Sequence, residues 1–93
     1  MLALKAAVIQ RVEHPLFEYP CPWSYRIIGT SETVIRDLVR ELLGDADYEI
    51  VLSAWSRTGR YVSLKLTLVV EDEDQRLTLY RRLGAEETVR YVL

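Results

Sequence analysis

Residues 61–70 read YVSLKLTLVV, and this stretch decides the fold of the 93-residue chain. Aliphatic side chains occupy every second position from Val62 to Val70, whereas Ser63, Lys65 and Thr67 lie between them. A period of two indicates a β-strand with one buried face and one face open to water. We therefore predict a strand over residues 61–70 in an antiparallel sheet that is covered on one side only.

A second strand is predicted immediately upstream, over residues 48–56 (YEIVLSAWS). Arg57-Thr58-Gly59 separates the two segments and is typical of a hairpin connection, because glycine readily adopts a positive φ. The two strands should therefore pair as an antiparallel hairpin.

Two helices are predicted on either side of this hairpin, over residues 32–43 and 73–83. The first follows a Thr30 or Ser31 cap, and the second opens on a capping box of Asp72 and Gln75. Gly44 and Gly84 stand where a left-handed residue commonly ends a helix. The inner faces are expected to consist of Val34, Ile35, Leu38, Val39 and Leu42 in the first helix, and Leu77, Tyr80 and Leu83 in the second.

The outer strands are predicted over residues 23–29 (WSYRIIG) and 87–93. Alternation directs the side chains of Trp23, Tyr25 and Ile27 toward the helices in the former. In the latter it directs those of Val89, Tyr91 and Leu93 inward.

The resulting order βαββαβ predicts an α+β fold, the ferredoxin-like sandwich, because right-handed crossovers and a central hairpin favour it. Its four-stranded antiparallel sheet has the spatial strand order 4-1-3-2, with two helices on one face and the other face open. We divide the chain into an N-terminal arm, residues 1–18, and a single domain, residues 19–93. Leu4, Val8 and Val12 have helical spacing, but a strand or a loose arm is an equally open interpretation.

Composition excludes several classes of protein. Apolar residues make up 49% of the chain, charged residues 28%, and the net charge is −2, which argues against tight binding to bulk nucleic acid. Cys21 is the single cysteine, so the chain forms no intrachain disulfide and no multi-thiolate metal site. We expect a cytoplasmic protein without a membrane span or signal peptide.

The stretch from Tyr19 to Gly29 (YPCPWSYRIIG) resembles the Pro-x-Pro-aromatic opening of the YbeD-like family. Residues 56–63 (SRTGRYVS) are similar to that family's hairpin, although Arg57-Thr58 departs from its usual Ser-Lys or Ser-Ser, and Arg26 replaces a lysine. Gln75 with Leu79-Tyr80, Leu83-Gly84 and the last strand complete the resemblance, which covers residues 19–93.

The resemblance implies a cytosolic bacterial protein without an established activity. It also implies a fold similar to ACT domains, the small regulatory modules that bind amino acids in metabolic enzymes.

The open sheet face is the leading candidate binding surface. Strand parity places Arg26, Lys65 and Arg90 there on three neighbouring strands, together with Trp55 and Tyr61. Cations beside aromatic rings suit an anionic or planar partner. The alternative, which base rates favour, is a solvated face whose charges prevent aggregation.

The hairpin is a second candidate, since Arg57, Gly59 and Arg60 could form an anion-binding nest from adjacent turn amides. Simple turn chemistry explains the same residues and is the favoured interpretation. The turn over residues 28–31 corresponds to the ligand site of ACT domains, but it lacks the acidic or asparagine partners that amino-acid sensing requires.

Other groups have ordinary explanations. Cys21 has no nearby cation, and His14 stands alone near the arm. The acidic run over residues 71–74 lacks the periodicity of a calcium loop and suits a helix start, so we predict no metal site and no cofactor.

The sequence therefore predicts a non-catalytic regulatory or protein-interaction domain, homodimeric or docked on a partner protein. The alternative is binding of nucleic acid or a small anionic ligand through the open face. An enzyme would need a cleft near Cys21 or His14 and is the third hypothesis.

Overall fold

The computed structural model describes residues 17–93, and the predictions for residues 1–15, including His14, fall outside that range. Six elements follow one another as predicted. Their bounds are β1 Cys21–Gly29, α1 Glu32–Leu43, β2 Tyr48–Trp55, β3 Val62–Val70, α2 Glu73–Gly84 and β4 Val89–Val92.

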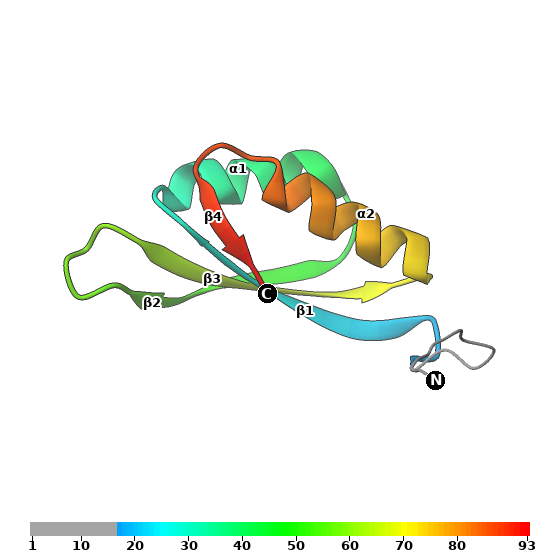
Figure 1. The fold of residues 1–93 in the computed structure, drawn as a ribbon. Coiled ribbons are helices and arrows are strands. Elements are labelled where there is room, and N and C mark those ends of the chain that lie inside the picture. The colour runs from blue at the N-terminus through cyan, green and yellow to red at the C-terminus, as the bar shows by residue number, and fades with distance from the viewer. Residues whose placement is uncertain (1–16) are drawn as a thin grey trace, which may run out of the picture.

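The four strands form one antiparallel sheet in the order β2-β3-β1-β4, which confirms the predicted ferredoxin-like topology. Both helices lie on the same side of this sheet, and its other side carries no element of the described chain (Figure 1). The β2–β3 hairpin extends past the helices at one end (Figure 1).

The core lies between the sheet and the helices, and β3 provides its centre. Its side chains alternate between buried and accessible along the whole strand, as the period of two predicts. The buried hydrophobic residues are Tyr25, Ile27, Ile35, Val39, Val62, Leu64, Leu66, Leu68, Val70, Leu79, Leu83 and Val89. Burying such side chains stabilises a domain by about 1.5–3 kcal/mol each before entropy is subtracted.

The predicted caps start both helices. Ser31 Oγ accepts a hydrogen bond from the Val34 amide at 3.2 Å, and Asp72 Oδ1 accepts one from the Gln75 amide at 2.7 Å. The Gln75 side chain in turn accepts from the Glu71 amide at 2.6 Å, so the capping box closes one residue earlier than its usual form.

The two glycines play different roles at the helix ends. Gly44 ends α1 at φ 55°, as predicted. Gly84 instead lies inside α2, and Ala85 caps the helix in a right-handed conformation. The predicted left-handed stop at Gly84 is therefore wrong.

The predicted inner face of α2 is partly wrong. Leu83 is buried, but Leu77 and Tyr80 are exposed, and Leu79 fills the core position instead. Leu79 and Leu83 are four residues apart and thus lie on one stripe of the helix. Polar residues surround both sets of apolar side chains, so the apolar periodicity of α2 is weak. The sequence alone therefore does not distinguish a stripe through Leu77 and Tyr80 from the stripe through Leu79 and Leu83.

A register shift changes β4. Ile28 pairs with Tyr91, but the next residue, Gly29, pairs with Val89, so Arg90 is an extra residue in the strand. Such a bulge reverses the alternation beyond it. Val89 and Val92 consequently pack against the core, whereas Tyr91 and Leu93 are exposed, so their predicted inward orientation is wrong.

A similar shift occurs in β2. Leu52 pairs with Leu64 and Ala54 pairs with Ser63, which leaves Ser53 as the extra residue. Trp55 therefore pairs with Val62, not with an open-face residue.

None of the helices within residues 17–93 is long and apolar enough to cross a membrane.

Candidate binding surface on the open sheet face

The open face is the side of the sheet opposite the helices. Strand register and hydrogen bonding assign to it Glu49, Val51 and Ala54 from β2, Ser63, Lys65, Thr67 and Val69 from β3, Pro22, Ser24, Arg26 and Ile28 from β1, Tyr91 from β4, and Leu93 directly after β4. These residues alternate with those of the core, so the face results directly from the sheet pleat.

Arg26 and Lys65 are direct cross-strand partners at the middle of this face. Both side chains are exposed. Like charges directly opposite one another destabilise a sheet. No ion pair within residues 17–93 includes either residue.

Apolar side chains flank the two cations. Val51 pairs with Lys65 on one side, and Leu93 exchanges two backbone hydrogen bonds with Arg26 on the other, at 2.9 and 3.0 Å. Val51 and Leu93 are 44% and 71% exposed. A row of apolar, cationic, cationic and apolar side chains therefore runs from β2 across β3 and β1 to the residue that follows β4.

The predicted third cation of the row, Arg90, is not placed beside Arg26. The bulge in β4 gives Tyr91 the position opposite Ile28, and Arg90 Nη1 donates to the Glu87 carbonyl at 2.8 Å. The prediction that Arg90 continues the row of Arg26 and Lys65 is therefore wrong. It assumed regular alternation along β4, and alternation does not continue through an extra residue.

The predicted position of Trp55 on the open face is wrong for the same reason. The shift at Ser53 gives Trp55 the parity of Val62, whose side chain is buried on the helix side. Trp55 is nevertheless 56% exposed, because the hairpin extends beyond the helices (Figure 1). It does not extend the row of cations.

Tyr61 and Arg90 come together at the hairpin end of the sheet. With Ile28, Ser56 and Tyr91 they line a shallow hollow of about 370 Å³. Trp55 borders an adjoining apolar hollow with Ile28 and Tyr61. The predicted site residues thus separate into the central Arg26–Lys65 pair and this peripheral group.

Three backbone amides of the hairpin tip donate hydrogen bonds within the turn. The Gly59 amide donates to the Ser56 carbonyl at 2.9 Å, and the Tyr61 amide donates to Ser56 Oγ at 3.0 Å. The Arg60 amide has Thr58 Oγ1 at 3.4 Å. Gly59 adopts φ 77°, so the favoured interpretation, turn chemistry, explains this segment. Arg57 and Arg60 remain exposed.

The turn between β1 and α1 is also satisfied locally. The Thr30 amide donates to the Thr88 carbonyl at 3.0 Å, and Ser31 caps the helix. Gly29 is required by close packing, since a Cβ there would lie 2.5 Å from the Thr88 carbonyl oxygen. Its role is to let β4 approach.

No three His, Cys, Asp or Glu side chains within residues 17–93 gather as metal ligands would. Asp72, in the acidic run, serves as the cap of α2. Cys21 is a free thiol packed against the core.

Sequence reasoning missed a cluster around Arg76. Its guanidinium lies 4.6 Å from the Trp23 ring centre and 5.6 Å from that of Phe17, whose rings meet edge to face at 4.7 Å. Arg76 Nε also donates to the Tyr19 hydroxyl at 2.9 Å. The aromatic spacing over residues 17–25 was the available signal, but nothing in the sequence paired it with a helix arginine.

Tyr25 completes the cluster by donating its hydroxyl proton to the Arg76 carbonyl at 2.6 Å. Burial raises the pKa of the Tyr25 phenol, and the positive charge of Arg76 partly opposes this. The hydrogen bond to Tyr19 is the main cause that raises the pKa of Arg76. The cluster joins β1 and the residues before it to α2. The aromatic residues of this segment therefore have a structural role.

Comparisons with known proteins agree with this fold. The family described as "Protein of unknown function (DUF493)" matches residues 14–93. A UPF0250 protein of Yersinia enterocolitica is 36% identical over 81 residues, which cover 84% of this chain and 92% of the relative. An uncharacterised protein of Campylobacter jejuni is 28% identical over 74 residues, covering 80% and 85% of the two chains.

Two solved structures share the architecture. The solution structure of protein HP0495 from Helicobacter pylori has a TM-score of 0.74 at 20% identity, covering 87% of this chain and 89% of that one. The ACT domain of GTP pyrophosphokinase from Chlorobium tepidum has a TM-score of 0.59 at 21% identity, covering 77% and 94%. These likenesses show the fold, which is ferredoxin-like and ACT-like.

Proposed function

The chain belongs to the DUF493 family of UPF0250 proteins, and from that premise we propose that it is a non-catalytic regulatory domain that binds a partner protein through its open sheet face. The observation that carries the proposal is the Arg26–Lys65 pair with its apolar flanks, Val51 and Leu93.

The chemistry of this row defines the partner. Two adjacent cations repel each other until a negative group lies between them, so a bound carboxylate would relieve a cost that the free domain bears. Val51 and Leu93 would at the same time be removed from water. The expected ligand is therefore a protein surface with an acidic side chain between apolar ones.

The face suits protein better than nucleic acid. Glu49 shares the face with the cations, and the chain's net charge is −2. Single-stranded nucleic acid is typically bound by aromatic platforms within a basic groove. Here Tyr61 and Tyr91 lie around the peripheral hollow, and Trp55 pairs with the helix-side residue Val62 and not with a residue of the open face.

A regulatory role is consistent with the fold of the ACT domain of GTP pyrophosphokinase, which is a module of an enzyme. The described residues also support a non-catalytic role, because their polar clusters are explained by capping, turn formation and packing.

The proposal is tested by affinity capture with the full chain immobilised. Proteins from a bacterial lysate that the wild type retains should be lost with Arg26→Glu and with Lys65→Glu, and the purified protein should then bind directly. Arg81→Glu is the matched control, since it makes the same charge change at an exposed arginine on α2. Equal retention by all four baits, or equal loss with Arg81→Glu, would refute the proposal.

A titration with single-stranded oligouridylate tests the alternative. Salt-sensitive amide shifts in NMR spectra, confined to β1 and β3, would replace the protein partner with nucleic acid. Unchanged spectra at low salt would leave the protein-binding proposal in place.

A further inference from the structure

We infer that the hollow at the hairpin end of the sheet binds a small aromatic carboxylate, with its ring against Tyr61 and Tyr91 and its carboxylate on Arg90. The hollow begins one open-face residue pair beyond the Arg26–Lys65 pair. The inference therefore concerns a second site and goes beyond the partner binding proposed for the centre of the face.

The floor of the hollow is a row of cross-strand partners on the open face. From β2 to β4 the pairs are Ala54–Ser63, Ser63–Ile28 and Ile28–Tyr91. Ala54 and Ser63 have small side chains, whereas the larger Trp55 and Tyr61 line the hairpin side. Ser63 Oγ is buried in this floor without a hydrogen-bond partner in the described chain, which strand pairing does not explain. A small floor between large side chains produces the depression.

The two register shifts of the described sheet both border this row. The extra residue of β2, Ser53, directly precedes Ala54, and the extra residue of β4, Arg90, directly precedes Tyr91. Bulges redirect side chains and are over-represented beside active sites. Here the bulge in β4 takes Arg90 out of the regular alternation, and Arg90 lines the hollow together with Tyr91.

Arg90 has the chemistry of a carboxylate receptor. Its Nη1 donates to the Glu87 carbonyl at 2.8 Å, which orients the guanidinium and leaves most of its N–H donors for another acceptor. None of the ion pairs formed by residues 17–93 includes Arg90. A guanidinium binds a carboxylate through two parallel hydrogen bonds, so the expected anion is a planar carboxylate.

Aromatic side chains supply the apolar part of the site. Tyr91 and Trp55 are 65% and 56% exposed, and Tyr61 is half-buried. Of the rings in the described residues, Phe17 and Trp23 pack against each other, and the rings around the hollow are in no such pair. Their faces are therefore available to a flat ring of a ligand, which aromatic side chains bind by offset or edge-to-face packing.

The size of the hollow limits the ligand to a small molecule. Its volume is about 370 Å³, and the adjoining apolar hollow adds about 190 Å³. Sites for small molecules usually measure about 300–1,000 Å³. A single or fused ring with one carboxylate fits this space, whereas a longer chain would extend onto the surrounding surface.

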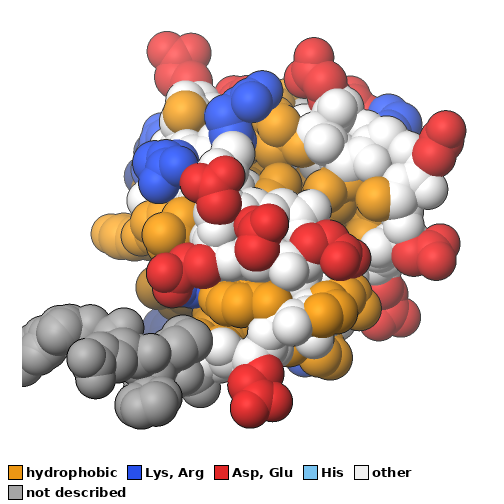
Figure 2. Space-filling model, turned by 90° about the vertical axis from the view of Figure 1, so that its right-hand side faces the viewer, with side chains coloured by type: hydrophobic (Ala, Val, Ile, Leu, Met, Phe, Trp, Pro, Cys, Tyr) orange, Lys and Arg blue, Asp and Glu red, His pale blue; other side chains and the backbone are white. Residues whose placement is uncertain are grey.

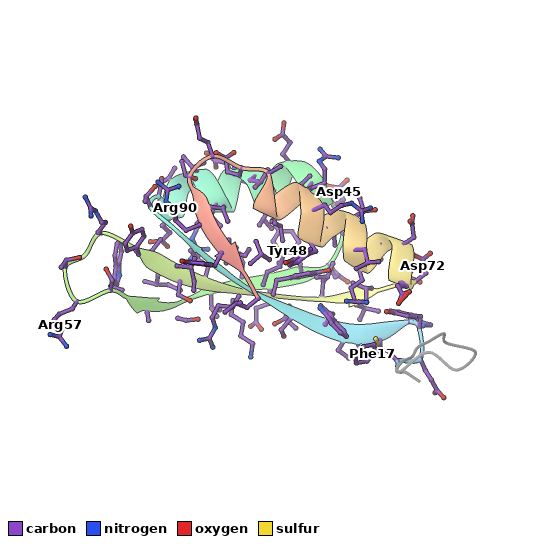
Figure 3. All side chains as sticks on the ribbon, in the orientation of Figure 1. Phe17, Asp45, Tyr48, Arg57, Asp72 and Arg90 are labelled. Atoms are coloured by element: carbon purple, nitrogen blue, oxygen red, sulfur yellow. The ribbon has the colours of Figure 1, made fainter. Side chains whose placement is uncertain are left out.

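The distribution of charge favours an anion at this end of the molecule. Arg57 and Arg60 are exposed in the adjacent hairpin. Figure 3 shows Arg57 and Arg90 toward one end and Asp45 and Asp72 toward the other. Figure 2 views the latter end, near the start of α2, and acidic side chains spread across it around hydrophobic ones. A small anion is therefore attracted to the hairpin end and repelled from the opposite one.

The experiment titrates naphthalene-2-carboxylate into the isotope-labelled full chain and follows the amide signals by NMR. The shifts should saturate and be confined to residues around the hollow. Naphthalene-2-methanol, a neutral probe with the same rings, should bind about tenfold more weakly, because it lacks the charge that Arg90 recognises. Arg90→Gln should weaken the carboxylate about tenfold and leave the alcohol unchanged, whereas Tyr91→Ala should weaken both probes alike.

The matched control is Arg82→Gln, an exposed arginine that borders the acidic hollow at the other end. It should bind the carboxylate as the wild type does. Arg90→Lys, which keeps the charge without the planar fork, should have an intermediate affinity. The dispersion of the NMR spectrum establishes that each variant is folded.

Equal affinity for the two probes would overturn the inference, and so would unchanged carboxylate binding by Arg90→Gln, shifts centred away from the hollow, or no saturable shifts. Lys65→Glu separates this site from the proposed function. It should lose the captured partner protein and retain the affinity for naphthalene-2-carboxylate, whereas Arg90→Gln should retain the partner. Loss of probe binding with intact partner capture, or the reverse, therefore identifies which of the two proposals is wrong.

Discussion

The guanidinium of Arg76 lies 4.6 Å from the ring centre of Trp23, so α2 and β1 are joined by a cation–π contact at the edge of the core. Phe17 and Tyr19 add a second aromatic face and a hydrogen bond to the same group. The side chain of Arg76 is only 19% exposed, which strengthens these contacts.

Arg76→Ala should lower the free energy of unfolding by about 2 kcal/mol, because it removes two cation–π contacts and one hydrogen bond. Arg76→Lys should retain only part of this, since lysine lacks the planar fork. Urea unfolding followed by circular dichroism measures the change. Arg81→Ala, on the exposed side of α2, should change the value by less than about 0.5 kcal/mol; equal effects at both sites would contradict the role of the cluster.

Tyr25 should make stability depend on alkaline pH. Burial raises the pKa of its phenol above the ordinary 10.0, so the folded state favours the neutral form. This contribution is complete below the ordinary pKa and is lost as the pH rises through the raised one. Tyr25→Phe should therefore reduce the fall in unfolding free energy above pH 10, measured by urea titrations at several pH values. Tyr80→Phe, at an exposed site, should follow the wild-type curve; an unaltered curve for Tyr25→Phe would reject the prediction.

Gly29→Ala and Gly84→Ala should have opposite effects. A Cβ at Gly29 would lie 2.5 Å from the Thr88 carbonyl oxygen, so β4 must move, at a cost of about 1–3 kcal/mol. A Cβ at Gly84 has its nearest neighbour at 4.0 Å, and alanine favours a helix by about 0.8–1.0 kcal/mol. Thermal unfolding of both variants compares them directly. A lower melting temperature for Gly84→Ala would show that helix propensity is not decisive there.

Asp72→Ala should destabilise the domain by about 1 kcal/mol, since it removes the acceptor for the Gln75 amide. Asp72→Ser should recover most of the loss because serine is also a good cap. Chemical denaturation provides the measurement. Asp74→Ala, which removes the same charge from the first turn without removing the cap, should cost clearly less; similar losses would attribute the effect to charge alone.

The sequence predicted the elements where one strong local pattern was present. The alternation over residues 62–70 gave the buried face of β3, and the caps at Ser31 and Asp72 gave the starts of both helices. It also brought Arg26 and Lys65 together, because both lie on strands whose register has no shift between them. The inner face of α2 was less predictable, since apolar residues occur on two of its sides.

The sequence by itself determined the order of the elements, the face that each regular strand buries, and the central cation pair, because these depend on periods of two and 3.6 residues within one segment. Only the tertiary structure decided where Arg90 and Trp55 lie and which aromatic rings hold Arg76. An extra residue in a strand is defined by how that strand pairs with its neighbouring strand. A contact between residues 17–25 and Arg76 exists only after distant segments of the chain have packed together.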